Sequence, residues 1–448
     1  MFRAYDVRGI VGEDLNDAVY TRLGQAFGQY LRERSGRNPS CAVGRDNRES
    51  SPSYLDAFSS GLLSVGCDVL DVGEMTTPGL YFANTFLKTT GAAAVTASHN
   101  PLQYNGVKFI YQGQSAGGEQ VQEIRRLAEK NVFTHGKSAR HRKNIRDAYL
   151  SALSENARLL QLKVVADCGN GVASNFAVSY LKSLGCEVVP LHCNSSKPFS
   201  VHPPDPVDPD NYADLAAAVR KHEADVGLLF DGDGDRVGAV DETGAIVSPD
   251  KLLILFARRF LSVNPGEKVV IEIKCSKAVE DEVKKHGGKP VWAPTGRTVI
   301  EDVLFKEKAK LAGEMSGHFF FLNGRAWLSE SLYAARQLLE IISINGSLSR
   351  QVASMPKYVS SQEYRFEVPD DKKLVIVDRL ASSFEKDREV SKLDGVKVLF
   401  DDGWGLVRAS NSEPKLSCRF ESGTQLGLEK IEDEFRLRLR KSGVEPPF

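Results

Sequence analysis

The stretch from Cys41 to Val72 decides the fold, and it reads CAVGRDNRESSPSYLDAFSSGLLSVGCDVLDV. It opens with a short apolar strand, continues through a polar loop into apolar residues at helical spacing, and returns through Gly66 to a second apolar strand. Glycine suits the left-handed residue that follows a helix. The order strand, helix, strand therefore predicts two parallel strands joined by a right-handed crossover helix.

The same order recurs at two later places in the chain. Gly185 separates a helical pattern from the strand at 188–189, and Gly287 does so before the strand at 291–292. The glycines lie domain-sized intervals apart, so the sequence predicts three similar mixed-sheet α/β domains. After residue 362 a strand, a helix, three short strands and a closing helix follow, which predicts a smaller C-terminal α+β domain. The predicted domains are 1–145, 146–246, 247–355 and 356–448.

The composition is that of an ordinary globular protein, and it excludes two classes of partner. The chain has 448 residues, of which 42% are hydrophobic, and 58 Lys and Arg balance 59 Asp and Glu. This balance offers no basic field for nucleic acid, and no apolar run is long enough to cross a membrane. The seven cysteines form no Cys-x-x-Cys pair, which argues against a disulfide framework. We expect a cytoplasmic protein, with the basic run from Lys130 to Arg146 as a solvated connector.

A strand in each α/β unit ends in a polar loop, which is where ligands of open α/β sheets bind. In the second unit, the strand at 226–230 runs into Asp231-Gly-Asp-Gly-Asp-Arg236. The glycines let the backbone fold tightly, so that three carboxylates can face one hard divalent cation. The main rival is an EF-hand, because Glu242 falls at position 12 of such a loop. Against it, Arg236 stands where the turn glycine belongs, and the flanks resemble strands.

The first unit ends a strand at Val95 and continues with Thr96-Ala-Ser-His-Asn-Pro101. Ser98 offers a hydroxyl at this strand end, with His99 beside it and Lys108 further along the chain. Taken alone, the loop would be an ordinary serine turn with a surface histidine. Combined with a loop of three carboxylates, the serine indicates phosphoryl chemistry. Acyl transfer is disfavoured because no Gly-x-Ser-x-Gly turn surrounds the serine.

Two further polar loops lie later in the chain. Arg408-Ala-Ser-Asn-Ser-Glu-Pro-Lys415 joins a guanidinium fork to short hydroxyl and amide donors, which are the parts of an anion-binding loop. A polar hairpin is an equally simple interpretation of that loop. Glu314-Met-Ser-Gly-His318 offers a carboxylate, a hydroxyl and an imidazole, which suit sugar hydroxyls but in an unspecific spacing.

These four loops, in this order, resemble those of the α-D-phosphohexomutase superfamily, and they are most similar to its phosphomannomutase/phosphoglucomutase branch. The resemblance runs from Phe2-Arg-Ala-Tyr-Asp-Val-Arg-Gly9 to Arg419-Phe-Glu421, which is nearly the whole chain. It implies three α/β domains and a smaller fourth domain around a central cleft, to which each domain contributes one loop. It also implies an isomerase that interconverts hexose 1-phosphate and hexose 6-phosphate as a monomer or homodimer.

The resemblance implies roles for residues of every loop. Ser98 would carry the phosphoryl group, and the Mg²⁺ ligands would be Asp231, Asp233, Asp235 and an oxygen of phosphorylated Ser98. Sugar hydroxyls would be bound by Glu314 and Ser316, and the unreacting phosphate by Arg408, Ser410, Asn411 and Ser412. Other substrate-binding positions of the family are occupied by Tyr5, Lys274 and Arg297. The remaining active-site positions are occupied by Arg8, His99, Lys108, Arg236 and His318.

The implied reaction passes through a hexose 1,6-bisphosphate, which also acts as the activator. Phosphorylated Ser98 would donate to a free hydroxyl, and the other phosphate of the bisphosphate would then return to the serine. The sequence leaves the general acid or base open between Lys108, His99 and His318. Arg297 stands where relatives often have histidine, so the preferred sugar also stays open.

Two alternatives stand beside this interpretation. A phosphoglucosamine mutase is the nearer one, although Met315 stands where that branch usually has glutamine. A non-catalytic, calcium-stabilised sugar-binding protein is the other, and it is motivated by the EF-hand-like spacing that ends at Glu242.

Overall fold

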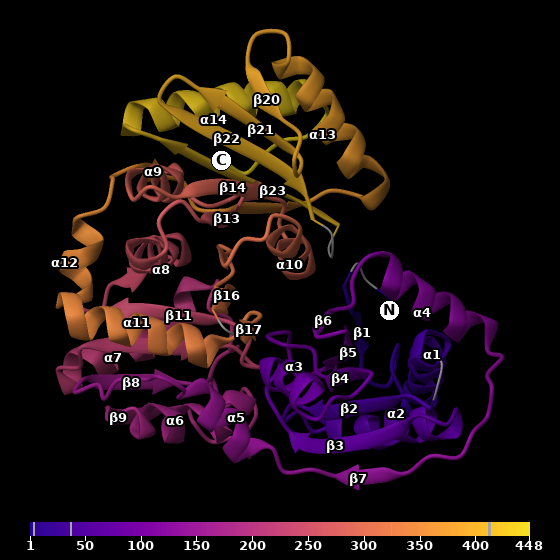
Figure 1. The fold of residues 1–448 in the computed structure, drawn as a ribbon. Coiled ribbons are helices and arrows are strands. Elements are labelled where there is room, and N and C mark those ends of the chain that lie inside the picture. Colours follow the sequence, from indigo (N-terminus) through magenta and orange to yellow (C-terminus); the bar gives the residue numbers. More distant parts are fainter. Residues whose placement is uncertain (3–4, 36–37, 324, 411–413) are drawn as a thin grey trace. The chain divides into compact units, whose positions relative to one another are not determined.

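Figure 1 shows the chain in a computed structural model, which describes residues 1–2, 5–35, 38–323, 325–410 and 414–448. The chain divides into two compact units. Unit 1 consists of Met1–Leu252 and Ser316–Ala353, and unit 2 of Leu253–Met315 and Ser354–Phe448. Unit 1 is therefore discontinuous in sequence. The chain leaves it within α8 (Pro249–Val263), returns for one segment, and leaves it again.

The first sheet of unit 1 is mixed (Figure 1). Among the described residues its strand order is β1-β5-β4-β2-β3-β7, with β6 paired to β5. β2 is parallel to β3 and β4, as the stretch Cys41–Val72 predicts, whereas β5 is antiparallel to β4. The strands are β1 (Val7–Ile10), β2 (Ser40–Arg45), β3 (Asp68–Glu74), β4 (Gly91–Val95), β5 (Tyr104–Tyr111), β6 (Gln114–Ser115) and β7 (Arg140–Arg142). The helices are α1 (Asp17–Ser35), α2 (Ser51–Ser64), α3 (Thr77–Phe86), α4 (Glu119–Lys130) and α5 (Arg146–Leu153).

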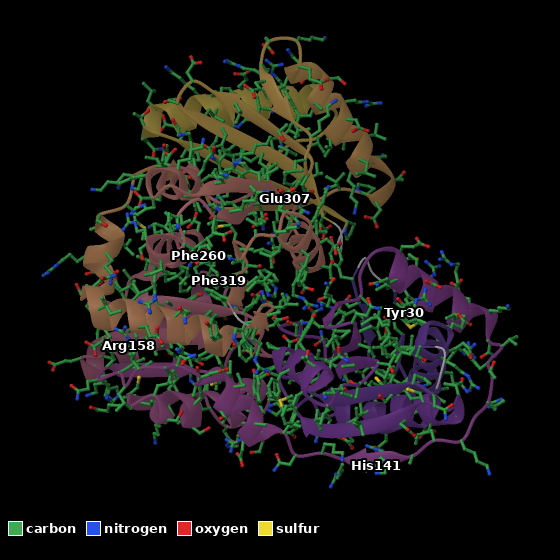
Figure 2. All side chains as sticks on the ribbon, in the orientation of Figure 1. Tyr30, His141, Arg158, Phe260, Glu307 and Phe319 are labelled. Atoms are coloured by element: carbon green, nitrogen blue, oxygen red, sulfur yellow. The ribbon has the colours of Figure 1, made fainter. Side chains whose placement is uncertain are left out.

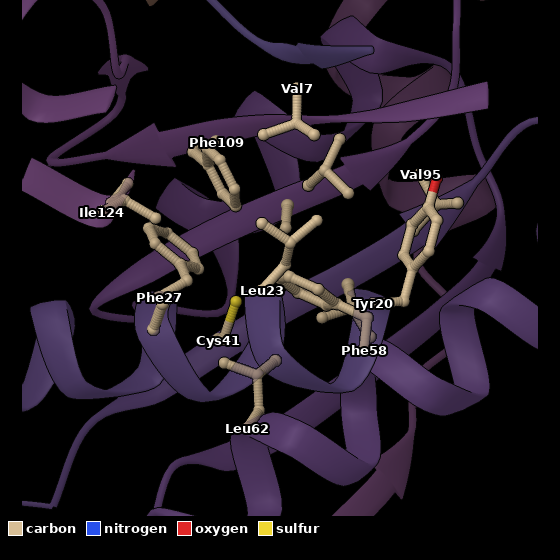
Figure 3. Packing of buried hydrophobic residues seen from close by; sticks show 14 of the residues in the cluster. Val7, Tyr20, Leu23, Phe27, Cys41, Phe58, Leu62, Val95, Phe109 and Ile124 are labelled. Carbon is tan, nitrogen blue, oxygen red and sulfur yellow. The ribbon is translucent and has the colours of Figure 1, made fainter. Parts of the chain in front are cut away.

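Helices α1 and α2 pack unusually closely. A Cβ atom on Gly24 would lie 2.1 Å from Phe58 O, and one on Gly61 would lie 2.0 Å from a backbone oxygen of α1, so only glycine permits this separation. Figure 3 shows the aromatic rings that fill the core beside these helices. The Phe27 and Phe58 ring centroids lie 4.8 and 6.3 Å from that of Phe109 on β5. These contacts fix both helices to the sheet that carries the serine loop.

The second sheet of unit 1 has the described strand order β12-β11-β10-β8-β9. β8 is parallel to β9 and β10, and β10 forms an antiparallel hairpin with β11. The strands are β8 (Lys163–Asp167), β9 (Glu187–Leu191), β10 (Val226–Phe230), β11 (Val237–Asp241) and β12 (Ile246–Val247). The helices are η1 (Val172–Asn175), α6 (Ala177–Ser183), η2 (Pro209–Tyr212) and α7 (Ala213–His222). The polar loops therefore follow the C-terminal ends of parallel strands, where the sequence places them.

The returning segment completes unit 1. It contains the hairpin of β16 (Phe319–Asn323) and β17 (Arg325–Trp327), followed by α11 (Ser331–Asn345) and α12 (Leu348–Ala353). The buried Arg336 of α11 donates to Leu153 O at 2.8 Å and to Glu155 O at 2.9 Å, just after α5. Because these carbonyls lie near the C-terminus of a helix, the guanidinium also complements the negative end of the helix dipole.

Unit 2 combines a parallel strand group with an antiparallel sheet. β13 (Lys268–Glu272) pairs in parallel with β14 (Lys289–Ala293) and β15 (Leu311–Gly313), and the helices of this part are α9 (Lys277–Lys285) and α10 (Arg297–Lys306). The described strands of the other sheet run β18-β23-β22-β21-β20, with β19 on β23. They are β18 (Val359–Ser360), β19 (Tyr364–Glu367), β20 (Glu389–Ser391), β21 (Val396–Phe400), β22 (Gly403–Ala409) and β23 (Lys415–Ser422), with α13 (Asp370–Phe384) and α14 (Gln425–Lys441).

The structure confirms the predicted helix ends, adds one strand to the basic connector and corrects the number of strands in the C-terminal domain. Gly66, Gly185 and Gly287 have φ angles of +76°, +89° and +75°, so each takes the left-handed conformation. The basic connector contains an exposed strand that the sequence did not reveal, β7, which pairs with β3. The C-terminal domain has four described strands between its two helices where three were predicted. Both missed strands, β7 and β20, are short and largely exposed, so they lack the apolar alternation that reveals a strand.

Candidate active site

The serine loop follows β4 and holds Ser98 in a left-handed backbone conformation. Its φ is +54°, and Thr96 Oγ1 accepts a hydrogen bond from the Ser98 backbone N–H at 2.9 Å. Residues other than glycine adopt this region only where their surroundings impose it. Ser98 is buried, and its Oγ donates to Asp231 Oδ2 at 3.0 Å. The turn therefore directs the Ser98 hydroxyl at the carboxylate loop after β10.

The carboxylate loop Asp231–Arg236 forms the turn of the β10–β11 hairpin. Gly234 has a φ of +74°, and Asp231 Oδ1 accepts from the backbone N–H groups of Asp235 at 2.9 Å and Arg236 at 3.0 Å. One oxygen from each of Asp231, Asp233 and Asp235 lies within 4.8 Å of the others. All three residues are buried, and within the described chain Asp233 Oδ1 has no hydrogen-bond partner. Converging buried oxygens of this kind fit a hard divalent cation, so the three aspartates could hold a metal ion.

Lys108, on β5, supplies a positive charge to the carboxylate loop. Its Nζ lies 2.6 Å from Asp233 Oδ2 and 2.7 Å from Asp235 Oδ2. Burial and the neighbouring carboxylates raise the pKa of Asp231. Burial and Asp235 act on Asp233 in the same direction, but Lys108 and a hydrogen bond from Thr77 hold its pKa below the ordinary value. The lysine therefore offsets part of the repulsion among the three carboxylates.

His99 lies beside the Ser98 hydroxyl as a neutral imidazole. Its Nδ1 is 3.3 Å from Ser98 Oγ. Loss of hydration, followed by the charges of Arg236 and Arg8, lowers the pKa of His99 well below its ordinary value. The neutral ring can accept or donate a proton at the serine oxygen.

Two arginines border the serine and carboxylate loops. Arg236 is buried, and its Nε lies 3.0 Å from Asp231 Oδ2 while its Nη1 lies 2.9 Å from Asp205 Oδ1. Arg8 of β1 donates to Asn100 Oδ1 at 2.7 Å and pairs with Asp6 at 2.7 Å. Both cations therefore lie at the loops that carry Ser98 and the aspartates, where anionic phosphate groups would be stabilised.

The returning segment brings His318 to the same loop. His318 Nδ1 lies 3.2 Å from Asp235 O and also contacts Ser329 Oγ, which donates to Asp235 O at 2.8 Å. Ser316 and Tyr5 are half-buried residues of the same unit. Unit 1 thus gathers Ser98, His99, Lys108, Arg236, His318 and the three aspartates around one pair of loops.

Arg48 is a residue of this region that the sequence analysis missed. It is buried after β2, and its Nη2 donates to Ser98 O at 2.8 Å and Asn100 O at 2.6 Å. Its Nη1 donates to Pro101 O at 2.8 Å and Tyr104 O at 3.0 Å. One guanidinium thus holds four carbonyls of the serine loop, a role that no local pattern in the sequence signals.

In unit 2, Glu314 and Lys274 lie at strand ends of the β13–β15 group. Glu314 is buried, and its Oε1 accepts from the Gly296 N–H at 3.0 Å. Burial and the nearby charge of Glu272 raise the pKa of Glu314 to about 7. Lys274 is also buried, and its Nζ lies 3.4 Å from Glu363 Oε2. These groups supply a carboxylate and an ammonium suited to polar ligands.

Asp394 connects the loop before α10 to the end of β22. Its Oδ2 accepts from the Thr295 N–H at 2.9 Å and from Arg408 Nε at 2.9 Å. Arg297, which begins α10, lies 3.3 Å from Glu301 on the next turn. Asp394 therefore links the loop before α10 to the expected phosphate-binding loop within unit 2.

The phosphate-binding loop is described only in part. The Ser410 N–H donates to Lys415 O at 2.9 Å, and Lys373 Nζ donates to Ser410 O at 2.7 Å. The predicted residues Asn411 and Ser412 lie outside the described residues.

The EF-hand alternative does not fit the structure. Strands β10 and β11 flank the loop where an EF-hand needs helices. Glu242, the expected twelfth ligand, instead accepts hydrogen bonds from the backbone N–H and the hydroxyl of Ser349. The carboxylate loop is therefore a strand-end loop of an α/β sheet.

Comparisons with known proteins cover nearly the whole chain. Four family descriptions match in order: the phosphoglucomutase/phosphomannomutase α/β/α domains I, II and III at residues 1–135, 144–244 and 248–358, and the C-terminal domain at 363–438. The architecture is thus three α/β domains followed by a C-terminal domain. Among the described residues, none of the helices combines the length and apolar character needed to cross a bilayer.

Individual relatives agree with the domain matches. A phosphomannomutase/phosphoglucomutase of Pseudomonas aeruginosa is 40% identical over 100% of this chain and 97% of its own length. A phosphoglucomutase/phosphomannomutase family protein of Burkholderia thailandensis has a solved structure with a TM-score of 0.94 and 35% identity, covering 100% of this chain and 99% of that one. An N-acetylphosphoglucosamine mutase of Aspergillus fumigatus, solved with GlcNAc-6P and magnesium, shares the fold with a TM-score of 0.63 and 13% identity, covering 98% of this chain and 95% of that one.

Proposed function

Because this chain belongs to the phosphoglucomutase/phosphomannomutase family of the α-D-phosphohexomutases, we propose that Ser98 carries the phosphoryl group that the enzyme transfers. The enzyme is an isomerase that interconverts hexose 1-phosphate and hexose 6-phosphate. The observation that carries the assignment is the Ser98 hydroxyl, held at a positive φ and 3.0 Å from Asp231 in a group of three buried carboxylates.

The proposed reaction consists of two equivalent phosphoryl transfers. In the first, the P–O bond of phosphorylated Ser98 breaks as a free hydroxyl of the hexose phosphate forms a new P–O bond. The hydroxyl proton leaves to a base, and the Ser98 oxygen gains a proton. In the second, the other phosphate of the resulting hexose 1,6-bisphosphate returns to Ser98 by the reverse chemistry. Phosphoryl transfer needs little covalent help from the protein, so positioning and charge stabilisation carry most of the catalysis.

The structure supports different roles for the three acid–base candidates. Lys108 Nζ is held between two carboxylates, which favours its charged ammonium form, so we assign it to charge stabilisation. The neutral His99 ring lies 3.3 Å from Ser98 Oγ, so we assign to it the exchange of a proton with that oxygen. His318 contacts Asp235 O of the carboxylate loop, and we retain it as a candidate for proton exchange with the sugar hydroxyl.

We propose Mg²⁺ as the cation of the carboxylate loop. The donor set consists of hard oxygen atoms, and the converging side chains of Asp231, Asp233 and Asp235 would hold the ion together with an oxygen of phosphorylated Ser98. When bound, Mg²⁺ supplies positive charge to the transferring phosphoryl group. Lys108 and Arg236 add charge from this chain on the same side.

We assign the distal phosphate to unit 2. Arg408 is suited to the distal phosphate because a guanidinium fork binds phosphate through two parallel hydrogen bonds, and Asp394 fixes its Nε. Glu314 and Ser316 remain the proposed ligands of sugar hydroxyls, with Tyr5, Lys274 and Arg297 as further substrate contacts. The hydroxyl and amide donors Ser410, Asn411 and Ser412 complete the proposed phosphate loop.

An intact-mass measurement of freshly purified protein tests the phosphoserine. We expect a fraction of the chains to be heavier by about 80 Da, the increment of one phosphoryl group, and this fraction to grow after incubation with glucose 1,6-bisphosphate. Ser98→Ala should lack the heavier species and show no mutase activity while keeping the circular dichroism spectrum of the parent. A parent that stays unmodified with bisphosphate, or an alanine variant with near-normal turnover, would refute the assignment.

A substrate panel tests the specificity. We expect mannose 1-phosphate and glucose 1-phosphate to be converted in the presence of a trace of their bisphosphates. Equal or better turnover of glucosamine 6-phosphate would instead identify a phosphoglucosamine mutase.

A further inference from the structure

A second group of side chains that could bind a metal lies at the ends of β8 and β9. Asp167 is the last residue of β8, and His192 follows β9. His202 lies in residues 193–208, a proline-rich excursion between β9 and η2. His192 Nδ1 lies 3.1 Å from Asp167 Oδ2, and His202 Nε2 lies 3.2 Å from the same oxygen. Both imidazoles and one carboxylate oxygen therefore converge on one point.

The other ring nitrogen of His202 has a hydrogen-bond acceptor, and that of His192 faces a carboxylate beyond hydrogen-bond distance. His202 Nδ1 lies 2.8 Å from Pro203 O, and a carbonyl can only accept, so this nitrogen carries a proton. His192 Nε2 lies 3.6 Å from Asp214 Oδ2 on the first turn of α7. Metal-binding histidines characteristically donate their second N–H to a carbonyl or carboxylate, which orients the ring and fixes the tautomer.

With that tautomer, the neutral His202 ring directs the lone pair of Nε2 at a carboxylate oxygen, which repels it. A proton or a metal ion between the two atoms removes the repulsion. Asp167 is buried, and its Oδ1 already accepts a hydrogen bond from the Gly169 N–H at 2.9 Å. Both histidines therefore face the other carboxylate oxygen, Oδ2. His192 directs its Nδ1 at the same Oδ2. One shared cation satisfies all three ligand atoms. Without it, His202 must carry a second proton on Nε2, as an imidazolium paired with Asp167, and His192 must donate to the same oxygen from Nδ1.

The spacing also suits a transition metal. Zinc ligands lie about 2.0–2.1 Å from a tetrahedral ion, which places neighbouring ligand atoms about 3.3 Å apart. The two distances measured here are 3.1 and 3.2 Å. Two imidazole nitrogens and one carboxylate oxygen are a donor set that prefers zinc and its neighbours to magnesium.

We propose that Asp167, His192 and His202 bind a Zn²⁺ ion. The site is separate from the three aspartates of the carboxylate loop, which offer oxygen atoms alone and favour Mg²⁺. Water would complete the coordination, since both histidines keep some exposure, with 15% and 13% of their side chains accessible.

The ion would fasten the proline-rich excursion to the sheet. Three residues after His202, Asp205 pairs with Arg236 of the carboxylate loop at 2.9 Å. Earlier in the same excursion, the Phe199 ring lies 4.7 Å from the guanidinium carbon of Arg48, which holds the serine loop. A metal at His202 therefore restrains a segment that supports both loops, in the manner of a structural zinc site.

Zinc retention against excess magnesium tests the proposal. The full-length chain is loaded with Zn²⁺, dialysed against a large excess of Mg²⁺, and analysed for metal. We expect about one Zn²⁺ per chain to be retained, and we expect His192→Gln and His202→Gln each to lose it. Two controls should retain it: His141→Gln, which changes an exposed histidine of β7 (Figure 2), and Asp231→Asn, which weakens the carboxylate loop.

The coordination of the retained metal provides a readout that needs no variant. X-ray absorption at the zinc edge of the parent should show nitrogen and oxygen neighbours with the outer-shell signature of two imidazoles. A parent that keeps no zinc, zinc that the histidine variants keep unchanged, or a coordination shell of oxygen alone would each overturn the proposal. The first result would leave Asp167 in a salt bridge with protonated histidine.

Discussion

Arg48 shows how a single buried cation can set the geometry of a reacting group. Its Nε is paired with Asp46 at 3.0 Å, and neither side chain is accessible to solvent. With its position fixed, the two Nη groups hold Ser98 and the residues after it by their carbonyls. The left-handed conformation of Ser98 is strained, so a rigid donor that binds this carbonyl stabilises it. Arg48 is therefore a positioning residue, because it acts on the hydroxyl through the backbone.

Replacing Arg48 by lysine should lower the turnover number more than it changes substrate affinity. An ammonium keeps the charge but cannot reach four carbonyls in the plane of a guanidinium. A displacement of about 1 Å at a reacting group can cost about 100-fold in rate, so we expect kcat to fall by about that factor with little change in KM. Steady-state kinetics of Arg48→Lys measure both constants.

Arg336→Lys is the matched control for this variant. Arg336 is another buried arginine of unit 1 that donates to carbonyls, but these lie after α5 and not in the serine loop. We expect a lower unfolding temperature with nearly unchanged kcat. If both lysine variants lose kcat equally, the effect of Arg48 is one of general stability.

At Arg408, we expect a lysine substitution to act mainly on KM. Lysine lacks the guanidinium fork, so one of the two parallel hydrogen bonds to phosphate is lost. A hydrogen bond to a charged group contributes about 1.5–3 kcal/mol, so KM should rise about tenfold or more. Arg388→Lys, at an exposed arginine paired with Glu434, serves as the control. An unchanged KM for Arg408→Lys would remove Arg408 from the phosphate site.

The sequence predicted candidate site residues where a polar loop directly follows a strand. Ser98 and the three aspartates stand in unusual polar loops immediately after apolar runs, so their position at a sheet edge could be predicted. Arg48 and Asp205 could not, because their partners lie 50 and 31 residues away in the chain. Their roles depend on contacts that only the folded backbone creates.

Among the elements, the crossing of α1 and α2 depends on the absence of side chains at Gly24 and Gly61. In an exposed helix, replacing glycine by alanine stabilises by about 1 kcal/mol. At Gly61 the added Cβ would meet a backbone oxygen of α1 at 2.0 Å, so the helices must separate. We expect Gly61→Ala to destabilise unit 1 by about 1–3 kcal/mol or more, seen as a lower midpoint of thermal unfolding.

Ser60→Ala, on the exposed side of α2, controls for helix propensity. It should leave the unfolding midpoint of the parent nearly unchanged. A Gly61→Ala variant that is as stable as the parent would show that the two helices can separate at no cost.

The start of α11 contains a buried acid that should make stability depend on pH. Glu330 accepts from the Leu332 N–H and receives the hydroxyl of Tyr149, and burial raises its pKa to about 8 from an ordinary value of 4.5. Between these two values the folded chain keeps a proton that the unfolded chain releases. Stability at this site therefore falls as pH rises through that window, by at most about 1.4 kcal/mol per pH unit.

Glu330→Gln should remove this contribution, because glutamine resembles the protonated acid and stays neutral. We expect the unfolding midpoint of the variant to decline less between about pH 6 and 8 than that of the parent. Glu129→Gln, at an exposed position of α4, should follow the parent. Parallel profiles for the parent and Glu330→Gln would contradict the assignment.

The elements that were predicted from the sequence have a clear apolar period. The helix over Ser51–Ser64 and the strands on either side of it follow from their spacing and from Gly66. The sequence did not predict β7 and β20. Their exposed polar residues pair through the backbone, and backbone pairing produces no alternation of apolar side chains.

At the scale of the molecule, unit 1 needs its returning segment. Ser329 and Ser331 donate to Asp235 O and Gly234 O, within the carboxylate loop, and Glu330 bonds Tyr149 of α5. A fragment of residues 1–252 leaves these polar groups without their partners. We expect it to be markedly less stable than the same fragment co-expressed with residues 316–353, measured by limited proteolysis.

A longer first fragment provides the decisive comparison. Residues 1–353 contain all of unit 1, so this fragment should resist protease at the carboxylate loop while its residues 253–315 are cleaved. Equal resistance of the 1–252 and 1–353 fragments would show that the returning segment contributes nothing to unit 1.

The discontinuity of unit 1 also sets an order of events during synthesis. The ribosome must make about 100 residues after Leu252 before α11 and α12 are complete. At about 5–20 residues per second, this takes roughly 5–20 s. Throughout that interval the nascent chain carries the carboxylate loop without Ser329 and Ser331, so the window in which chaperones and proteases can act on this enzyme is determined by where the chain returns to unit 1.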